Sequence, residues 1–415
     1  MKKTWLAGLV VCLPLAAQQA AYIGAGGCAS SNCHGGTTPA QESVSRILGT
    51  EYSIWAVSDK HAKAAQVLSN PRSKRMAEIL GIQDPVTDRR CASCHVVGSP
   101  PSSLSDGVAC EACHGAAEKW LGPHTQKNSH ATSLGLGLAE TKNPRKRAEL
   151  CLSCHLGAKD RVVDHELIAA GHPDLAFELD TFGWAQPAHW REPKPEAGNT
   201  LPRVRLWAVG QAVALREGMK LLAERAAAKW PELAELECYQ CHHDLRAESW
   251  RIQRGYPNRR PGAMQANLAR TDVARILISV AAPEQKAAVE AALGRVEEAV
   301  QSRFAEGAAI AEAARAAAAE AERVVARLEA QDFSPAMARS LVEALTASVE
   351  RVAGNGPHSA EQILMSLDAL SAALTKNDRR VQQAMGEVYT YLEHPSVYNP
   401  RQFVTLFRKA AAQVN

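Results

Sequence analysis

Five times in this chain of 415 residues, two cysteines are followed directly by a histidine. The two cysteines are separated by four residues in the first motif and by two residues in the other four. Two thiols at such a spacing can add to the vinyl groups of a porphyrin as thioethers, and the next imidazole can bind the iron as its proximal ligand. The sequence therefore predicts five covalently bound c-type haems. The residues of the motifs are Cys28, Cys33 and His34; Cys91, Cys94 and His95; Cys110, Cys113 and His114; Cys151, Cys154 and His155; and Cys238, Cys241 and His242.

Other uses of paired cysteines fit the pattern less well. Such pairs also ligate zinc, form disulfides or act as redox dithiols. Zinc sites combine half-sites at short, regular spacings and need no histidine directly after every pair. Ten of the eleven cysteines lie inside the five motifs, so none of these ten remains for a structural disulfide. The pattern favours haem over zinc or disulfides.

The first 21 residues have the pattern of a signal peptide. A short basic region, Met1 to Lys3, precedes an apolar run from Trp5 to Ala16, and small residues follow it. The run is too short to span a membrane, so we expect it to be removed after export together with Cys12. Because bacteria attach haem c after export, the expected location is the bacterial periplasm.

Composition changes near residue 260 and divides the rest of the chain. All eight tryptophans, all eleven cysteines and twelve of the fourteen histidines come before this point. We therefore predict a pentahaem cytochrome c domain over 22–262 and an alanine-rich helical domain over 263–415. The net charge of +3 is small for this length and does not suggest a nucleic acid or an anionic membrane surface as partner.

The predicted fold class is mainly α, a loop-rich multihaem domain followed by a helical bundle. In the haem domain the helical pattern is clearest over 53–68 and 202–230, with loops rich in proline and glycine between them. Five haems in so short a domain leave little room for an ordinary core, so the macrocycles must supply much of the buried apolar surface. We expect five tryptophans to pack against them: Trp55, Trp120, Trp184, Trp190 and Trp250.

The carboxy-terminal segment has apolar residues at helical spacing and three patterns typical of helix starts. These begin at Ser334, Ser359 and Asn399. They predict a bundle of four or five helices that stabilises the haem domain. The alanine-rich stretch 283–331 could instead form one long coiled-coil-like helix that mediates dimerisation or docking to a membrane complex.

Seven further histidines in the haem domain are candidates for the sixth coordination position of the irons. His61 lies on a predicted helix, His172 lies between glycine and proline, and His124 closely follows the third motif. His243 directly follows a proximal ligand, so it could reach only a neighbouring haem. These four candidates rank above His130, His165 and His189, and the sequence does not pair any of them with a particular iron.

Several segments resemble multihaem cytochromes c of the cytochrome c-554 type. They are the run from Trp55 to Ala62, the surroundings of the third motif over 107–115, the stretch 164–173 and the run 241–245. This family is related in haem packing to hydroxylamine oxidoreductase and pentahaem nitrite reductase. The resemblance covers 22–262 and implies closely stacked haem pairs, mostly histidine-ligated irons and periplasmic electron transfer between redox partner proteins.

The chain also departs from these relatives. It has five motifs where cytochrome c-554 has four, and it lacks both a Cys-x-x-Cys-Lys motif and a match for the tyrosine crosslink of hydroxylamine oxidoreductase. The leading hypothesis is therefore an electron carrier with no catalytic residue. One alternative is an oxidoreductase whose open haem acts on a small nitrogen or sulfur species. The other is a haem-bearing docking module that uses the helical tail to join a membrane complex or a second copy of itself.

Overall fold

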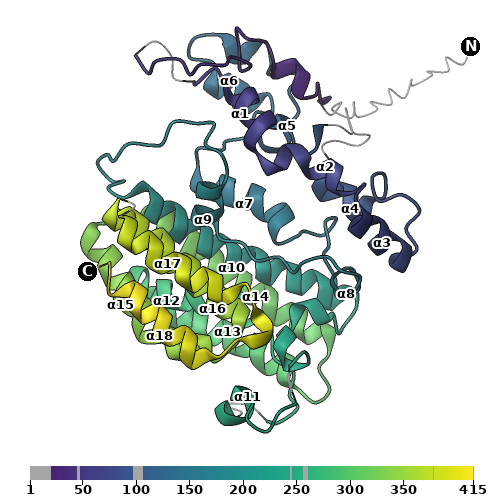
Figure 1. Cartoon of the computed structure of the whole chain (residues 1–415), viewed down its shortest axis with the longest axis vertical. Coiled ribbons are helices and arrows are strands. Elements are labelled where there is room, and N and C mark those ends of the chain that lie inside the picture. The colour runs from purple at the N-terminus through teal and green to yellow at the C-terminus, as the bar shows by residue number, and fades with distance from the viewer. Residues whose placement is uncertain are drawn as a thin grey trace, which may run out of the picture.

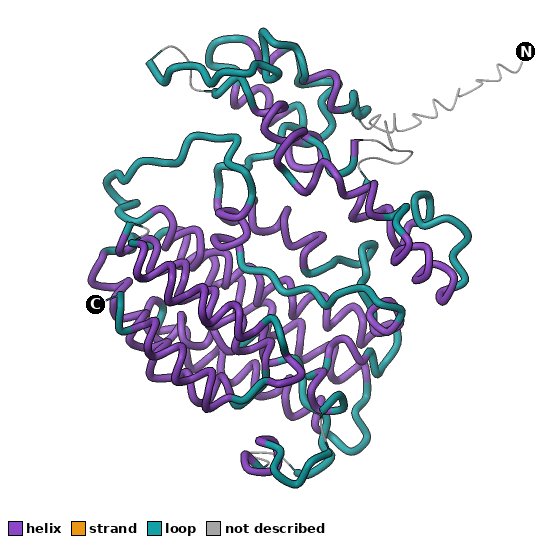
Figure 2. The backbone as a smooth tube through the Cα atoms, viewed as in Figure 1, coloured by secondary structure: helices purple, strands orange, loops and turns teal. Residues whose placement is uncertain are grey.

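The computed structural model describes residues 20–43, 47–96, 106–243, 245–255, 260–376 and 378–414. Within these ranges the chain consists of helices and loops, with three isolated bridges as its only β pairing (Figure 2). This confirms the mainly α prediction. Most of the predicted signal peptide, with Cys12, lies outside the described residues. None of the described helices is long and apolar enough to cross a membrane.

The amino-terminal part contains short helices separated by long loops (Figure 1). Three of the haem motifs end such helices, because a motif with two intervening residues places its cysteines and histidine at positions i, i+3 and i+4, on one helix face. His95 is the last residue of α4, His114 of α5 and His155 of α7. The α-helices of this part are α1 (Glu51–Ser58), α2 (Ala64–Val67), α3 (Pro71–Leu80), α4 (Arg89–His95), α5 (Cys110–His114), α6 (His130–Gly135), α7 (Pro144–His155), α8 (His165–Ala169) and α9 (Leu179–Ala185).

Side-chain caps begin several of these helices. Asp88 accepts a hydrogen bond from the Arg90 amide at the start of α4, and Asn143 and Asp164 cap α7 and α8 in the same way. Each cap satisfies a backbone N–H that would otherwise lack a partner in the first turn. The three helices, two of which carry a haem motif while the third carries His165, are therefore each capped at the amino terminus by a local polar residue.

The helix predicted over 53–68 is interrupted at Asp59. Here α1 ends, and a 3-10 turn (Lys60–Lys63) joins it to α2. Asp59 has an extended backbone, and its carboxylate accepts a hydrogen bond from the His61 amide. The interruption puts His61 in a 3-10 turn and not inside an α-helix.

The helical bundle forms the other half of the molecule (Figure 1). Its longest helix, α10, begins at Pro202 and ends just before Trp230, close to the predicted bounds, and packs along α14. Because α10 precedes residue 262, the bundle contains residues from both sides of the predicted domain boundary. The remaining helices are α11 (Trp250–Arg254), α12 (Asp272–Ala281), α13 (Lys286–Gln301), α14 (Gly307–Glu329), α15 (Pro335–Ala353), α16 (Pro357–Thr375), α17 (Arg379–Leu392) and α18 (Pro400–Ala411), with α10 itself spanning Pro202–Ala228.

The carboxy-terminal predictions are partly confirmed. Ser334 and Asn399 cap α15 and α18 as expected, whereas α16 begins at Pro357, two residues before Ser359. The segment 283–331 is not one long helix, because the chain turns between α13 and α14 and these two helices pack against each other. Seven α-helices, α12 to α18, follow residue 263 in the described chain, so the expected number of four or five was too low.

Apolar side chains are buried very unevenly. One continuous core joins residues of α7 and α9 to the bundle and extends from Ala148 to Val414. Among the described residues of the amino-terminal part there are only two small clusters, one around Ala25 and Ala109 and one around Ala65, Leu68 and Val96. Protein side chains alone therefore form almost no core around the first three motifs, as expected if the macrocycles fill that space.

Candidate haem sites

The five motifs define five candidate haem sites, numbered 1 to 5 in chain order. A bound haem c would be held by the two cysteines of each motif and by its histidine, which binds iron through Nε2. Bis-histidine ligation needs a second imidazole facing the first across the iron. The positions of the other histidines therefore test whether the structure fits the cofactor.

Four of the five motif histidines have a second imidazole ring at nearly the same distance. The distances between ring centroids range from 6.0 to 6.5 Å. Two metal–imidazole bonds of about 2 Å, with about 1 Å from each nitrogen to its ring centre, add up to about 6 Å. The pairs are His34 and His124 at site 1 (6.3 Å), His95 and His172 at site 2 (6.5 Å), His155 and His61 at site 4 (6.0 Å), and His242 and His165 at site 5 (6.3 Å). This spacing leaves room for one metal ion between the rings, so the residues fit the group.

The residues of the motif at site 3 are half-buried. Burial, followed by the nearby charges of His189 and His34, lowers the pKa of His114 to about 4. His189 is the second imidazole near this site. Its Nδ1 donates a hydrogen bond of 3.4 Å to the carbonyl oxygen of Pro187, and its ring packs against Trp190.

The side chains of two other candidate histidines are exposed. The side chain of His243 is exposed, and the ring opposite His242 is that of His165. His130 is also exposed, and its Nε2 lies 2.9 Å from a carboxylate oxygen of Glu140. Sequence reasoning ranked His165 and His189 below His243. The local signal that could have favoured His165 is its position next to Asp164, which caps the helix that carries it.

The Nδ1 atoms of the paired imidazoles have two kinds of partner. At site 1, His34 Nδ1 lies 3.0 Å from Glu51 Oε2, and at site 4, His61 Nδ1 lies 3.0 Å from Asp59 Oδ1. At site 2 the partners are backbone carbonyl oxygens, Ala64 for His95 at 3.0 Å and Pro173 for His172 at 2.7 Å. These contacts fix the ring orientations and the tautomer that leaves Nε2 free for a metal.

Asp59 is held in its ionised form. Burial alone would raise its pKa, but hydrogen bonds from His61 and Gln186 outweigh this effect and lower the pKa to about 2. Gln186 Nε2 donates to Asp59 Oδ2 at 2.9 Å, while Oδ1 faces His61. Both carboxylate oxygens therefore have partners although the residue is only 2% exposed.

Cysteines of different motifs lie next to each other. The Cys28 and Cys110 thiols interact, which lowers the pKa of Cys28 and raises that of Cys110, so sites 1 and 3 are neighbours. The Cys94 and Cys154 thiols interact in the same way, which raises the pKa of Cys94 and lowers that of Cys154, so sites 2 and 4 are neighbours. Burial, followed by the nearby site 4 thiols Cys151 and Cys154, raises the pKa of Cys113 at site 3 to about 12.

The segment that contains His172 and Asp174 lies between sites 2 and 5. Asp174 comes two residues after His172, and its carboxylate lies within 4.8 Å of the Cys238 sulfur. His358, on α16 of the bundle, completes this contact. Cysteine interactions thus link sites 1 and 3, sites 3 and 4, and sites 4 and 2, and the segment from His172 to Asp174 leads from site 2 to site 5.

Aromatic side chains pack against several of these imidazoles. Phe177 stacks on His155 with ring centroids 4.8 Å apart, and Phe182 contacts the same ring. Trp120 meets His124 edge-on, and Trp190 meets His189. For two of the five tryptophans expected near the haems, the aromatic or cation–π contacts are with residues outside the haem sites. Trp250 packs against Tyr398 of the bundle, and Trp184 is stacked with Arg203.

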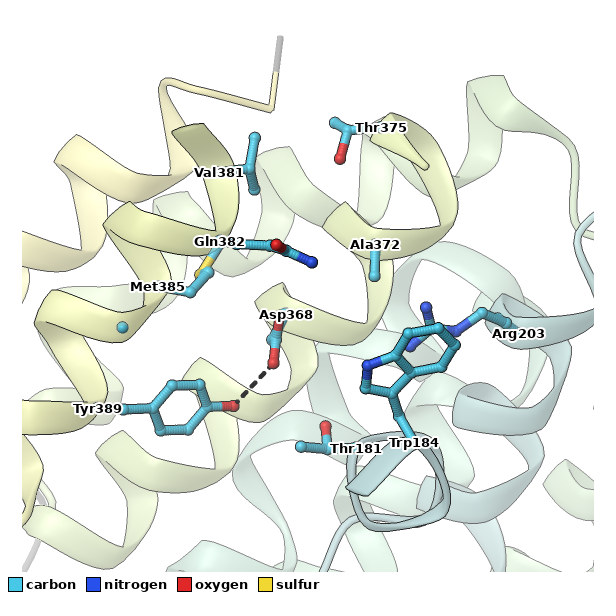
Figure 3. Close-up of a pocket in the computed structure, with 11 residues that line it drawn as sticks. Thr181, Trp184, Arg203, Asp368, Ala372, Thr375, Val381, Gln382, Met385 and Tyr389 are labelled. Atoms are coloured by element: carbon cyan, nitrogen blue, oxygen red, sulfur yellow. Dashed lines mark hydrogen bonds between the residues drawn. The ribbon is translucent and has the colours of Figure 1, made fainter. Parts of the chain in front are cut away.

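Trp184 lines a cavity of about 210 Å³ between α9, α10, α16 and α17 (Figure 3). Tyr389 donates a hydrogen bond of 3.2 Å to Asp368 on one side of it, and Arg203 lies on the other side (Figure 3). The same short helix, α9, thus lines this cavity with Trp184 and contacts His155 with Phe182. None of the paired histidines lines this cavity.

Haem-attachment motifs whose histidines face a second imidazole are typical of c-type cytochromes, a class of protein whose haems transfer electrons. Residues 28–115 of this chain match the model of the family described as cytochrome c554 and c-prime. The chain is similar to cytochrome c-554 of Nitrosomonas europaea, with 29% identity over 118 residues, which cover 23% of this chain and 48% of that protein. It thus spans about half the length of the curated relative that it matches. No solved structure matches the chain.

Proposed function

We propose that this chain is an exported pentahaem cytochrome c that relays single electrons between redox partner proteins in the bacterial periplasm. The observation that carries the proposal is the set of imidazole pairs at 6.0 to 6.5 Å, found at four of the five motifs. Irons with two histidine ligands have no coordination position open for a substrate, so their role is electron transfer.

The proposal assigns a distal ligand to every iron. His124, His172, His61 and His165 would serve sites 1, 2, 4 and 5, because their rings face the motif histidines. His189 would serve site 3, since it lies near His114. His165 and His189 thereby take the place of His243 among the candidates.

The arrangement of the sites supports a linear relay. Cysteine interactions link site 1 to site 3, site 3 to site 4 and site 4 to site 2, and the segment from His172 to Asp174 leads from site 2 to site 5. In this order an electron that enters at site 1 would leave at site 5 after passing every haem. Site 1 lies at the amino-terminal end of the fold, and site 5 lies against the bundle through His358. A donor and an acceptor could then bind at opposite ends without competing for the same surface. We also propose that all five haems lie within a haem domain over 22–262 and that 263–415 forms the helical domain, with α10 of the first range packed along α14 of the second.

The test is electron paramagnetic resonance of the oxidised, purified protein together with a haem count by mass. Five haems that are all low-spin, with no spectral change on adding nitrite, hydroxylamine or cyanide, are expected. Fewer than five haems would contradict the count. A high-spin signal that shifts with a small ligand would instead favour the enzyme alternative, and site 3 would be the first place to locate the open iron.

A further inference from the structure

The second nitrogen of a ligating imidazole gives the protein a way to change the reduction potential of the iron. When Nε2 binds the metal, Nδ1 carries a proton that it donates to a neighbour. A carboxylate draws this proton more strongly than a peptide carbonyl does, and it thereby increases the electron density that the ring gives to the iron. Stronger donation, with a negative charge nearby, stabilises ferric over ferrous iron.

Two of the five sites have a carboxylate in this position. They are site 1, where Glu51 faces His34, and site 4, where Asp59 faces His61, both at 3.0 Å. At site 2 both imidazoles face carbonyl oxygens, those of Ala64 and Pro173. All three sites have histidine ligands. Sites 1 and 4 differ from site 2 because the group that accepts the Nδ1 hydrogen bond is an anionic carboxylate and not a neutral carbonyl.

Both carboxylates are fixed by contacts of their other atoms. Glu51 Oε1 accepts a hydrogen bond of 2.7 Å from the Leu48 amide, which leaves Oε2 for His34. Asp59 is held by the His61 amide and by Gln186. Because the second oxygen is engaged in each case, the carboxylate cannot turn away from the imidazole without losing another hydrogen bond.

We infer that Glu51 and Asp59 are positioning residues that lower the reduction potentials of sites 1 and 4 relative to site 2. The inference rests on the proposed function, since it requires that haems occupy these sites. In the spatial order of the sites, carboxylate-backed positions are the first and the third. Along that order, site 4 would then release an electron more readily than site 2, which follows it.

The experiment is a redox titration of the holoprotein, followed by optical and electron paramagnetic resonance spectra. Asp59→Asn and Glu51→Gln replace the anionic acceptor by a neutral one of similar shape. Each variant is expected to raise the potential of one haem so that its ferrous-to-ferric ratio at a fixed potential increases about tenfold, which is about 59 mV for a one-electron couple. Asp59→Glu should restore most of the wild-type value. Glu78→Gln, which changes an exposed carboxylate on α3, is the matched control and should leave all five potentials unchanged.

A further variant tests the sign of the effect. Gln186→Leu removes the competing hydrogen bond from Asp59 Oδ2, so it should make the carboxylate a stronger acceptor for His61 and lower the potential of site 4. This variant keeps the test decisive if Asp59→Asn loses its haem. Unchanged potentials in Glu51→Gln and Gln186→Leu, with five low-spin haems still bound, would overturn the inference and leave the proposed relay intact. A wild-type protein without the five low-spin haems would overturn the proposed function itself.

Discussion

The imidazole rings of His34 and His124 face each other nearly in parallel, with their planes 16° apart. The equivalent planes are 89° apart for His61 with His155 and 88° apart for His95 with His172. Sites that share the same pair of ligand types therefore differ in ligand orientation, and this difference has a spectroscopic consequence.

We expect two kinds of low-spin signal from the oxidised protein. Parallel imidazole planes separate the energies of the two iron orbitals that interact with the ring π systems, whereas perpendicular planes leave these orbitals nearly equal. Site 1 should give an ordinary rhombic spectrum, and sites 2 and 4 should give strongly anisotropic spectra with a large maximum g value. Electron paramagnetic resonance at low temperature measures this. Rhombic spectra from all five haems would contradict the ring orientations.

Removal of His165 should open site 5. His165→Ala deletes the ring opposite His242, so one haem is expected to become high-spin and to bind cyanide or carbon monoxide. His243→Ala is the matched control, because it removes an exposed imidazole one residue from the same proximal ligand and should leave five low-spin haems. If the control and not His165→Ala produced the high-spin signal, His243 would be the distal ligand.

The buried carboxylate of Glu235 should contribute strongly to stability near site 5. It is 2% exposed and pairs with Arg225 at 2.6 Å and Arg270 at 2.5 Å. Glu235→Gln leaves two guanidinium groups facing a neutral amide, and we expect a loss of about 3 kcal/mol in the free energy of unfolding. Chemical denaturation of the holoprotein, monitored by circular dichroism, measures it. The exposed Glu248→Gln should change the stability little, and an equal loss in both variants would argue against the effect of burial.

The stability of the fold should fall with rising pH because of Glu178. This residue caps α9 through the amides of Asp180 and Thr181, and burial, followed by the nearby charge of Asp180, raises its pKa from 4.5 to about 8. The folded state therefore holds a proton that the unfolded chain has released. The resulting stabilisation is complete below about pH 4.5 and is lost as the pH rises through about 8.

The comparison with Glu178→Gln isolates this effect. Glutamine stays neutral at every pH, so the stability of wild type relative to the variant should decrease between pH 5 and pH 8. Denaturation midpoints of both proteins at these two values measure the change. The same pH dependence in both proteins would show that Glu178 is not its source.

The features that could be predicted from sequence depend on residues close together in the chain. A haem motif is complete within a few residues, and the starts of α15 and α18 depend on Ser334 and Asn399 next to proline. The interruption at Asp59 was missed although it is also local, because the pattern of apolar residues continues across it while the carboxylate takes the His61 amide as its partner.

The pairing of histidines could not be predicted, because it depends on contacts between distant segments. His165 and His242 meet because Arg225 donates hydrogen bonds both to Glu235 and to the Val163 carbonyl, which holds the chain before α8 against the chain before the fifth motif. No pattern near His165 records that contact. Likewise, composition placed α10 in the haem domain. Apolar residues occur on every side of this helix, and its packing against α14 explains why.

The two small apolar clusters of the amino-terminal part have a consequence for biogenesis. Full burial of a large aliphatic side chain contributes about 1.5–3 kcal/mol, and these clusters bury few such side chains, Leu68 and Val96 among them. This cannot offset the conformational entropy lost by so many loop residues. We therefore expect this part of the chain to remain an open polypeptide, tethered to a folded bundle, when no haem is attached. In that state its thiols would be accessible for haem attachment, so we expect haem supply to limit the yield of folded protein and the haem-free chain to be sensitive to proteolysis.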